Sequence, residues 1–428
     1  MLPRFEVVAR RRPVRLVVPD GAPPRAPYVA TSAPGTRELS LAGGDVTLTA
    51  TCGDRVALHV TAGGRTTTHR SRRSGRPEAP VEAVALTLTG PQVTALTLEA
   101  GAWVARARYD LTDRHDVHDE GWLAVLAGTG DETGRFGQVG LRDLRVVSQA
   151  DGSAYVRDGR VLLTATSAGP GGFPTGHCSV WSLDPSTLEL EHRADLFHRR
   201  DPGGVYGDHA AHLHRDGDRW LLASSTWGDF DRVKRPVGAT IAESTADLTR
   251  GVHVLDSRPL ALPTEGFRSV GVWDPHLARD GDGWLVGYVS ATKYFRFHPA
   301  LAAGPSLDAL TLRAVASGHR ETEGTTLARV GGEWRVLASD KRRRRYPVLD
   351  LDLRDVATLD AAYPTNIPWP TLVDLDGEQL LVGFNGAAYG GRLVGYGSHG
   401  EVVLQRATQP MRRASRQGGE STPHPRRN

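Results

Sequence analysis

The sequence predicts an all-β protein, a five-bladed β-propeller preceded by a small N-terminal β-sandwich. Three observations support this prediction. Glycine and proline account for 49 and 27 of the 428 residues, so turns are frequent and long helices are disfavoured. The length of 428 residues allows a sizeable core, and the hydrophobic content of 39% is ordinary for a globular protein. Beyond residue 145, an apolar strand, a glycine turn and a second apolar strand recur five times.

The first 27 residues are basic and proline-rich, with a run of arginine from Arg10 to Arg12. Residues 5–8 and 14–18 are apolar enough to form short edge strands. An arm that binds an anionic partner is one interpretation, but a single arginine triplet is common on solvated segments. We therefore expect residues 1–27 to form a solvated leader.

Residues 28–140 are predicted to form the sandwich and a linker. Between residues 36 and 112, threonine alternates with valine or leucine, as in 45–50, 56–61 and 82–88. This period of two is typical of strands with one buried and one wet face. Residues 113–140 are rich in Asp, Gly and His, and we expect them to link the domains with one short helix.

The repeat predicts a propeller over residues 141–405. Asp-Gly and Gly-Gly favour the positive φ angles of tight hairpin turns. Successive turns lie 46 to 64 residues apart, which leaves room for about four short strands, the content of one blade. A large irregular sandwich is the alternative architecture. The turn glycines are Gly159, Gly217, Gly281, Gly331 and Gly377. The polar, arginine-rich segment 406–428 is predicted to be a disordered tail.

Charge and cysteine content exclude several classes of function. With 52 Lys+Arg against 49 Asp+Glu, the net charge of +3 gives no reason to expect a nucleic acid or a membrane as partner. Two cysteines exclude a disulfide framework and a cysteine-based zinc module. The N-terminus has no apolar signal segment, so we expect a cytoplasmic protein. The run Lys341–Arg345 could meet a phosphate or an acidic sugar, but such runs are more often solvated loops.

Four acids lie seven to nine residues before a turn glycine, on the strand expected to line the channel of each blade. Such acids would meet at one axis, and their repulsion would raise at least one pKa. A protonated carboxyl and an ionised one are what glycosidic cleavage requires. Caps of blade turns are the structural alternative. The predicted catalytic residues are Asp151, Asp208, Asp274 and Glu323.

Aromatic and polar side chains on the same strands are predicted to bind a sugar. Tryptophan faces stack on sugar rings, and polar tips bind hydroxyl groups. The predicted substrate-binding residues are His209, His212, Trp273, His276, His319, Trp369 and Asn385. His209 and His212 lack an evident third partner, so we predict no metal site. No cofactor is expected; a structural calcium ion is possible, although no ligands for it are identified.

These segments resemble the five-bladed propeller glycoside hydrolases, the clan of family 43 with the related families 32, 62 and 68, which include invertases and levansucrases. The motifs are Asp274-Pro-His-Leu, Glu323-Gly-Thr-Thr-Leu and Ala150-Asp-Gly-Ser-Ala-Tyr. The resemblance implies a base Asp, an orienting Asp and an acid Glu on successive blades. It assigns Asp274 as the orienting residue and Glu323 as the acid, and leaves Asp151 and Asp208 as alternatives for the base.

The resemblance implies a glycosidase acting on a short oligosaccharide or a furanoside, of the arabinofuranoside, xyloside or fructofuranoside class. A glycoside phosphorylase is one alternative, and it predicts a cationic cluster beside Glu323, with Lys341–Arg345, His319 and Arg320 as candidates. A non-catalytic sugar-binding or scaffold propeller is another. It predicts acids that point away from the axis or are neutralised by arginine.

Overall fold

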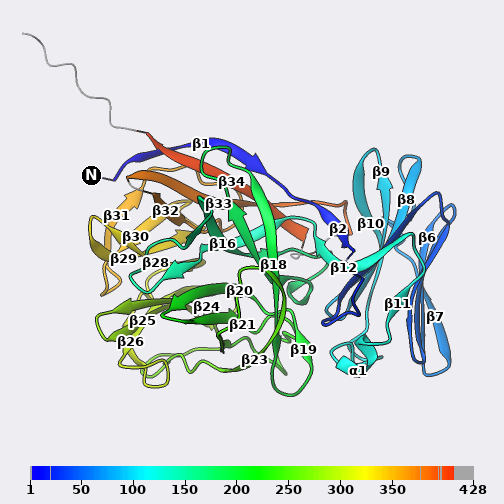
Figure 1. Ribbon diagram of the computed structural model, residues 1–428, viewed down its shortest axis with the longest axis horizontal. Helices are drawn as coiled ribbons and strands as arrows, with labels where there is room; N and C mark the ends of the chain where they lie inside the picture. The colour runs from blue at the N-terminus through cyan, green and yellow to red at the C-terminus, as the bar shows by residue number, and fades with distance from the viewer. Residues whose placement is uncertain (1, 20, 376, 394, 396–397, 409–428) are drawn as a thin grey trace, which may run out of the picture.

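The computed structural model describes residues 2–19, 21–375, 377–393, 395 and 398–408, and these form a β-sandwich beside a β-propeller (Figure 1). Two short segments are helical in this part of the chain, α1 (Glu120–Leu123) and a 3-10 turn at Phe173–Thr175. No helix in these ranges has the length and apolar content needed to cross a membrane. The all-β prediction is confirmed.

The N-terminal sandwich consists of two antiparallel sheets. One sheet has the order β10-β9-β8-β3-β12-β2, with bounds Ala102–Asp110, Gln92–Glu99, Val81–Thr89, Tyr28–Pro34, Glu132–Gln138 and Arg15–Val18. The other has the order β11-β4-β5-β6-β7, with bounds Ala127–Gly128, Glu38–Gly43, Val46–Cys52, Val56–Ala62 and Arg65–His69. Strand β5 alternates buried and half-buried side chains, as its Val/Thr pattern predicts. Leu41, Leu48 and Leu86 are fully buried between the sheets.

The propeller has five blades of four main strands each. Blade 1 contains β13 (Leu141–Val146), β16 (Arg160–Ser167), β17 (His177–Leu183) and β18 (Leu190–Arg199). Blade 2 contains β20 (His209–Asp216), β21 (Arg219–Ser225), β22 (Ala239–Ser244) and β23 (Gly251–Pro259). Short pairs are added by β14 (Ser148–Gln149), β15 (Val156–Arg157) and β19 (Val205–Tyr206). The outer strands β18 and β23 pair in parallel and join these two blades into one sheet.

The remaining three blades are separate four-stranded sheets. Blade 3 contains β24 (Val272–Asp280), β25 (Gly283–Lys293), β26 (Arg296–Gly304) and β27 (Thr311–Val315). Blade 4 contains β28 (Thr322–Val330), β29 (Glu333–Asp340), β30 (Tyr346–Leu349) and β31 (Asp355–Leu359). Blade 5 contains β32 (Thr371–Leu375), β33 (Glu378–Ala388), β34 (His399–Thr408) and β1 (Arg4–Arg11).

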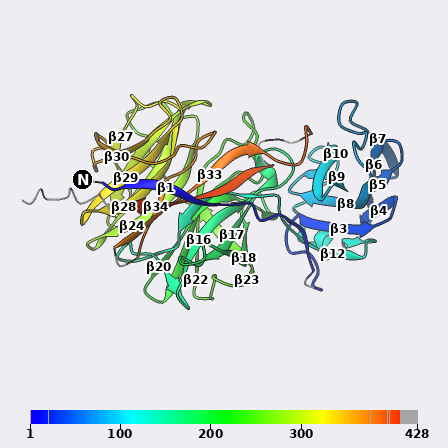
Figure 2. The ribbon, with the colours of Figure 1, turned by 90° about the horizontal axis from the view of Figure 1, so that it is seen from above.

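The N-terminal segment closes the ring, which differs from the solvated leader that we expected. Strand β1 pairs antiparallel with β34, from Arg4 opposite Thr408 to Arg11 opposite Val402 (Figure 2). Phe5 is 4% exposed and packs among side chains of blades 4 and 5. Of the predicted disordered tail 406–428, residues 406–408 belong to β34, and the rest lies outside the described residues.

Blade 1 departs from the predicted hairpin repeat, and this matters for the site. In blades 2, 3 and 4, the turn glycine joins the innermost strand directly to the second strand. In blade 1, Gly159 joins the short strand β15 to β16, and the long inner partner of β16 is β13. The channel strand of blade 1 therefore lies before Asp151 in the chain.

Candidate active site

The innermost strands of blades 1 to 4 each contain a β-bulge near their start. The register shifts between Arg142 and Arg145 in β13, and at the matching places of β20, β24 and β28. A bulge leaves one residue unpaired and redirects its side chain. The residues with positive φ at the four bulges are Asp143 (53°), Ala210 (56°), Asp274 (56°) and Gly324 (72°).

Three carboxylates meet at the channel mouth because of these bulges. Asp143 of blade 1, Asp274 of blade 3 and Glu323 of blade 4 line one cavity of about 350 Å³. Asp143 and Asp274 are 5% and 2% exposed. The structure thus brings the predicted pair Asp274 and Glu323 together and adds a third acid, Asp143, which the sequence analysis missed.

The other two predicted catalytic residues do not line this cavity. Asp151 is exposed on the turn before β15 and accepts hydrogen bonds from the backbone N–H and the hydroxyl of Ser153. Asp208 is fully buried and accepts from the Arg200 guanidinium at 2.5 and 2.9 Å, and from the Gly228 N–H at 2.9 Å. Burial raises the pKa of Asp208, but the Arg200 charge and hydrogen bonds outweigh this effect and hold it below its usual value.

Asp151 and Asp208 therefore have structural roles. Asp143 takes the place on blade 1 that we had assigned to Asp151. In blades 2, 3 and 4, the bulge residue lies seven positions before the turn glycine. Asp208 lies two positions before the blade 2 bulge, where Ala210 carries no carboxylate. Asp274 is itself the bulge residue of blade 3, and Glu323 directly precedes the bulge residue of blade 4, so the position relative to the bulge decides which acids reach the channel.

The environment of the three acids favours their protonated forms. Burial raises the pKa of Asp143, and the charges of Arg142 and Arg145 oppose the rise. Burial, and next the Glu323 charge, raise the pKa of Asp274 well above its usual value. Burial and the Asp143 charge raise the pKa of Glu323 to about 7, against the effects of Trp273, Trp369 and Lys341. The cluster therefore holds at least one proton at neutral pH.

A buried arginine forms the floor beneath the acids. The Arg145 guanidinium is fully buried and donates to the Thr325 carbonyl, the Thr326 hydroxyl and the Asp274 carbonyl, each at 3.0 Å. It also lies 4.6 Å from the centre of the Trp369 ring. Its positive charge favours ionisation of Asp143 and Asp274, and its donors fix the backbone of blades 3 and 4.

Aromatic side chains form the walls of the cavity. Trp227 stacks on Phe173 at 4.7 Å and meets Trp273 edge-on at 5.8 Å. Blade 3 contributes further rings, with Tyr294 5.5 Å from Phe230 and Phe297 5.7 Å from Trp273. Trp369, Asn366 and Ile367 precede β32 and complete the lining from blade 5. Flat apolar walls around a few polar groups are typical of sites that bind sugar rings.

The predicted substrate-binding residues separate into two groups. Trp273, Trp369 and His209 line the acid cavity. His209 is neutral, because burial lowers its pKa to about 3, and its Nε2 lies 3.0 Å from the Phe173 carbonyl. The residues outside the cavity lining are His212, His276, His319 and Asn385.

Each of these four has another place in the propeller. His212 and His276 stack at 3.8 Å deeper in the channel, and His276 borders a cavity at its other end. His319 lies 3.3 Å from Asp355 in blade 4. The Asn385 amide donates to Glu401 at 3.2 Å. The substrate-binding assignment of these four residues therefore does not fit the cavity.

Among the described residues, no group of three or more His, Cys, Asp or Glu side chains is placed to hold a metal ion. Burial lowers the pKa of His212 and His276, which leaves both imidazoles neutral. Both ring nitrogens of His212 already have partners. Its Nε2 lies 3.0 Å from the Ser148 hydroxyl, and its Nδ1 accepts a hydrogen bond from the Leu277 N–H.

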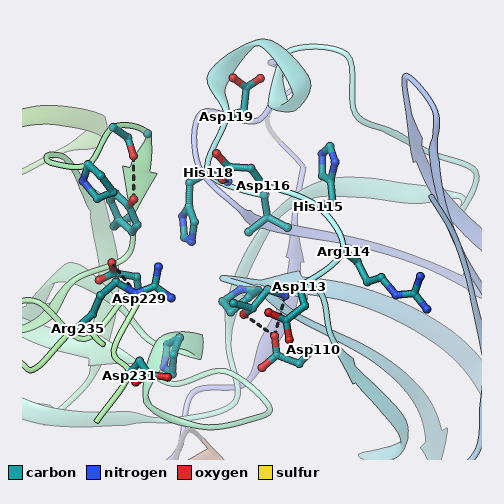
Figure 3. A pocket seen from close by; sticks show the side chains of 18 of the residues that line it. Asp110, Asp113, Arg114, His115, Asp116, His118, Asp119, Asp229, Asp231 and Arg235 are labelled. Carbon is teal, nitrogen blue, oxygen red and sulfur yellow. Dashed lines mark hydrogen bonds and ion pairs between the residues drawn. The ribbon is translucent and has the colours of Figure 1, made fainter. Parts of the chain in front are cut away.

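A second, larger cavity of about 1040 Å³ lies between the sandwich and the propeller, and Figure 3 shows its acidic lining. Six of the seven carboxylates there accept hydrogen bonds from the local backbone or from arginine. Asp116 accepts from the His118 N–H at 3.0 Å, Asp119 caps α1 through the Trp122 N–H at 2.6 Å, and Asp229 accepts from Arg200 at 2.6 Å. These contacts give Asp116, Asp119 and Asp229 structural roles in turns and at the interface. The acid cavity of the channel is therefore the better candidate for chemistry.

Comparison with known proteins gives matches in structure alone. No protein-family model and no curated protein sequence matches the chain. A GH32 β-fructofuranosidase from Bombyx mori aligns with 62% of this chain and 60% of its own length, at 15% identity and a TM-score of 0.43. The chain thus spans about three fifths of that relative.

Two further solved structures show a similar level of likeness. A family 117 glycoside hydrolase from Zobellia galactanivorans aligns with 63% of this chain and 84% of its own, at 9% identity and a TM-score of 0.43. A GH43_1 enzyme from Xanthomonas citri, solved with xylose, aligns with 60% and 86%, at 12% identity and a TM-score of 0.42. All three are glycoside hydrolases, and each has a TM-score below 0.5.

Proposed function

We propose that the protein is a glycoside hydrolase that cleaves a short oligosaccharide or a furanoside. The observation that carries this proposal is the meeting of Asp143, Asp274 and Glu323 in one aromatic cavity. Glycosidic cleavage needs a proton donor for the leaving oxygen and a carboxylate on the other side of the anomeric carbon. A scaffold propeller has no need to crowd three acids into one cavity, where their repulsion costs stability.

Glu323 is the proposed acid. Its pKa of about 7 keeps about half of it protonated at neutral pH, and it lines the cavity together with Trp369. It would pass its proton to the glycosidic oxygen as the bond to the anomeric carbon breaks.

Asp143 is the proposed base or nucleophile. Its pKa is raised less than that of Asp274, and Arg142 lies 3.3 Å away to favour the ionised form. In an inverting reaction it would take a proton from the attacking water, and in a retaining reaction it would attack the anomeric carbon itself. Asp274 donates a hydrogen bond from its backbone N–H to the Ser225 hydroxyl at 2.8 Å. Its carboxyl group would orient both the sugar and the Glu323 carboxyl.

The size of the cavity favours a small substrate. About 350 Å³ is at the lower end of the range for ligand sites and accommodates one or two sugar rings. The proposed substrates are therefore arabinofuranosides, xylosides or fructofuranosides cleaved from a chain end. A phosphorylase on the same acids is the second candidate, because Lys341 lines the cavity beside Glu323.

The test is a screen of purified protein against aryl glycosides of arabinofuranose, xylose and galactose, and against short fructofuranosides. We expect release from at least one of them, with hydrolysis independent of added phosphate. Absence of cleavage across the panel, with folding verified by circular dichroism, would overturn the proposal. Products that appear as sugar phosphates only when phosphate is added would favour the phosphorylase.

A further inference from the structure

Cationic side chains from two blades border the mouth of the acid cavity. Arg232 comes from the loop between β21 and β22, and Lys341 from the turn between β29 and β30. Both residues are exposed, and both line the cavity in which the three acids lie. Blade 3 lies between them and contributes Tyr294 and Phe295, of which Phe295 is 70% exposed.

Ion pairs within the protein neutralise only part of the positive charge at the mouth of the acid cavity. The Lys341 ammonium lies 2.8 Å from Glu321. The carbon of the Arg232 guanidinium lies 5.1 Å from the centre of the Tyr294 ring, and no carboxylate of the described chain pairs with it. A cation–π contact of this kind leaves guanidinium N–H groups for another acceptor.

The positive charge continues outward along blade 4. A neighbouring cavity of about 330 Å³ is lined by Arg320, Arg342, Arg343, Gly318 and Asp340. Asp340 is the acid in this lining, and Arg343 lies 3.5 Å from it. Within the described ranges, Arg320 and Arg342 have no ion pair. The run that begins at Lys341 is therefore placed beside the acid cavity.

The opposite charge lies in the cavity next to the sandwich, which blade 2 also borders. There Phe230 borders both the acid cavity and the cavity next to the sandwich. That second cavity has seven carboxylates in its lining, against the cations Arg114, Lys234 and Arg235 (Figure 3). A ligand with a negative group would be repelled on this side and attracted toward blade 4.

We propose that the substrate of this site carries an anionic group, a phosphate, sulfate or carboxylate, which binds the cationic rim formed by Arg232, Arg320, Lys341 and Arg342. This inference rests on the proposed glycoside hydrolase function and specifies its substrate class. The sugar ring would lie among the aromatic walls, and the charged group would extend past Lys341 toward Arg342. Guanidinium groups bind such anions through paired, charge-assisted hydrogen bonds.

The test is calorimetric binding, which needs no turnover. Fructose 6-phosphate, arabinose 5-phosphate and glucuronate are compared with fructose, arabinose and glucose, at 20 mM and 200 mM salt. At low salt we expect at least one anionic sugar to bind about tenfold tighter than its neutral partner, with a smaller ratio at high salt. Which anion shows the effect distinguishes a phosphate from a carboxylate.

The double variant Arg320→Gln/Arg342→Gln should reduce that ratio to about twofold or less. The matched control is Arg313→Gln, because Arg313 is exposed on the outer strand β27 of blade 3, and it should leave the ratio unchanged. Equal binding of charged and neutral sugars, no detectable binding of any anionic sugar, or a ratio that survives the double variant would each overturn the inference.

Failure of the hydrolase proposal can be recognised separately. If anionic sugars bind at the rim but no glycoside is cleaved, the inference stands and the proposed reaction falls. If neutral and anionic glycosides are hydrolysed with the same KM, the reaction stands and the inference falls. If added inorganic phosphate is consumed as a second substrate, the rim holds a reactant, and the inference is again overturned.

Discussion

The distribution of protons among Asp143, Asp274 and Glu323 decides which of them can act as acid and which as base. Replacing Glu323 by Gln keeps the shape of the side chain and removes its acid proton. We expect kcat to fall by about 10² to 10⁴, while sugar binding persists. Glu333→Gln is the control, since Glu333 is exposed on β29 and should leave kcat unchanged. Steady-state kinetics with one aryl glycoside measures both variants, and parental turnover in Glu323→Gln would exclude it as the acid.

The pH dependence of activity follows from the raised pKa of Glu323. A general acid works while protonated, so kcat/KM should fall as the pH rises through about 7. Lys341 acts against this rise in pKa, so Lys341→Met should shift the alkaline limb to higher pH. A pH–rate profile from pH 5 to 9 measures both effects, and an alkaline limb unmoved by the variant would contradict the assignment of Glu323.

The raised pKa of Glu323 also makes the stability of the folded protein depend on pH. The folded protein binds the Glu323 proton more tightly than the unfolded chain, so this contribution is present below the unfolded pKa of about 4.5 and is lost as the pH rises through about 7. The parental Tm should therefore fall more between pH 5 and pH 8 than the Tm of Glu323→Gln. Thermal unfolding at the two pH values measures this, and parallel losses in both proteins would argue against a buried, protonated Glu323.

Asp143 and Asp208 should respond in opposite ways to the same substitution. Asp143→Asn is expected to abolish turnover and to cost less stability than Asp208→Asn, because the relief of repulsion from Asp274 and Glu323 offsets the loss of the charge beside Arg142. Asp208→Asn is expected to cost about 3 kcal/mol of unfolding free energy, because it breaks a buried pair with Arg200. Urea unfolding and kinetics of both variants test this. A stable but inactive Asp208→Asn would restore Asp208 as the base.

At the scale of the elements, the β-bulges direct the acids into the channel. Gly324 has a φ of 72°, and a Cβ there would lie 2.5 Å from the Trp369 ring. Gly324→Ala should therefore displace Trp369 and reduce both kcat and stability. Gly331→Ala is the matched control, because Gly331 also has a positive φ of 62° but no atom within 4 Å of an added Cβ. It should cost about 1 kcal/mol and leave kcat unchanged. Equal kinetic effects of the two would contradict the role of this bulge.

The hairpins explain how much of the site the sequence could predict. The turns at Gly217, Gly281 and Gly331 are local, so strand, turn and strand can be read directly from the residues. They locate the channel strands of blades 2, 3 and 4, and thereby Asp274 and Glu323. In blade 1 the turn at Gly159 follows the inserted strand β15, so counting back from it leads to Asp151 instead of Asp143. Bulges leave no clear signal in one sequence, which is why the offset of Asp208 was not recognised.

At the scale of the whole molecule, the ring closes through residues that are about 400 positions apart. This pairing could not be predicted from local patterns, because nothing in the sequence of β1 specifies β34 as its partner. The basic run Arg10–Arg12 instead suggested a solvated arm, although Arg10 lies 2.8 Å from Glu401 of β34. Closure matters for function because Trp369 and Asn366 of blade 5 line the acid cavity.

Closure can be tested with two substitutions in one strand. Phe5 is 4% exposed, and Phe5→Ala should lower the unfolding free energy by about 3 kcal/mol. Val7 is 39% exposed, and Val7→Ala should change it by less than about 0.5 kcal/mol. Urea unfolding measures both variants. A tolerated Phe5→Ala would show that β1 contributes little to the closed ring.

The central claim is that Asp143, Asp274 and Glu323 act on one sugar from three blades. The most direct measurement is a crystal structure of the Glu323→Gln variant with a glycoside that the parental protein hydrolyses. The account predicts the anomeric carbon between the Asp143 carboxylate and the side chain of residue 323, with the sugar ring against Trp273 or Trp369. A sugar bound in the cavity beside the sandwich, or one whose anomeric carbon is out of reach of Asp143, would contradict it.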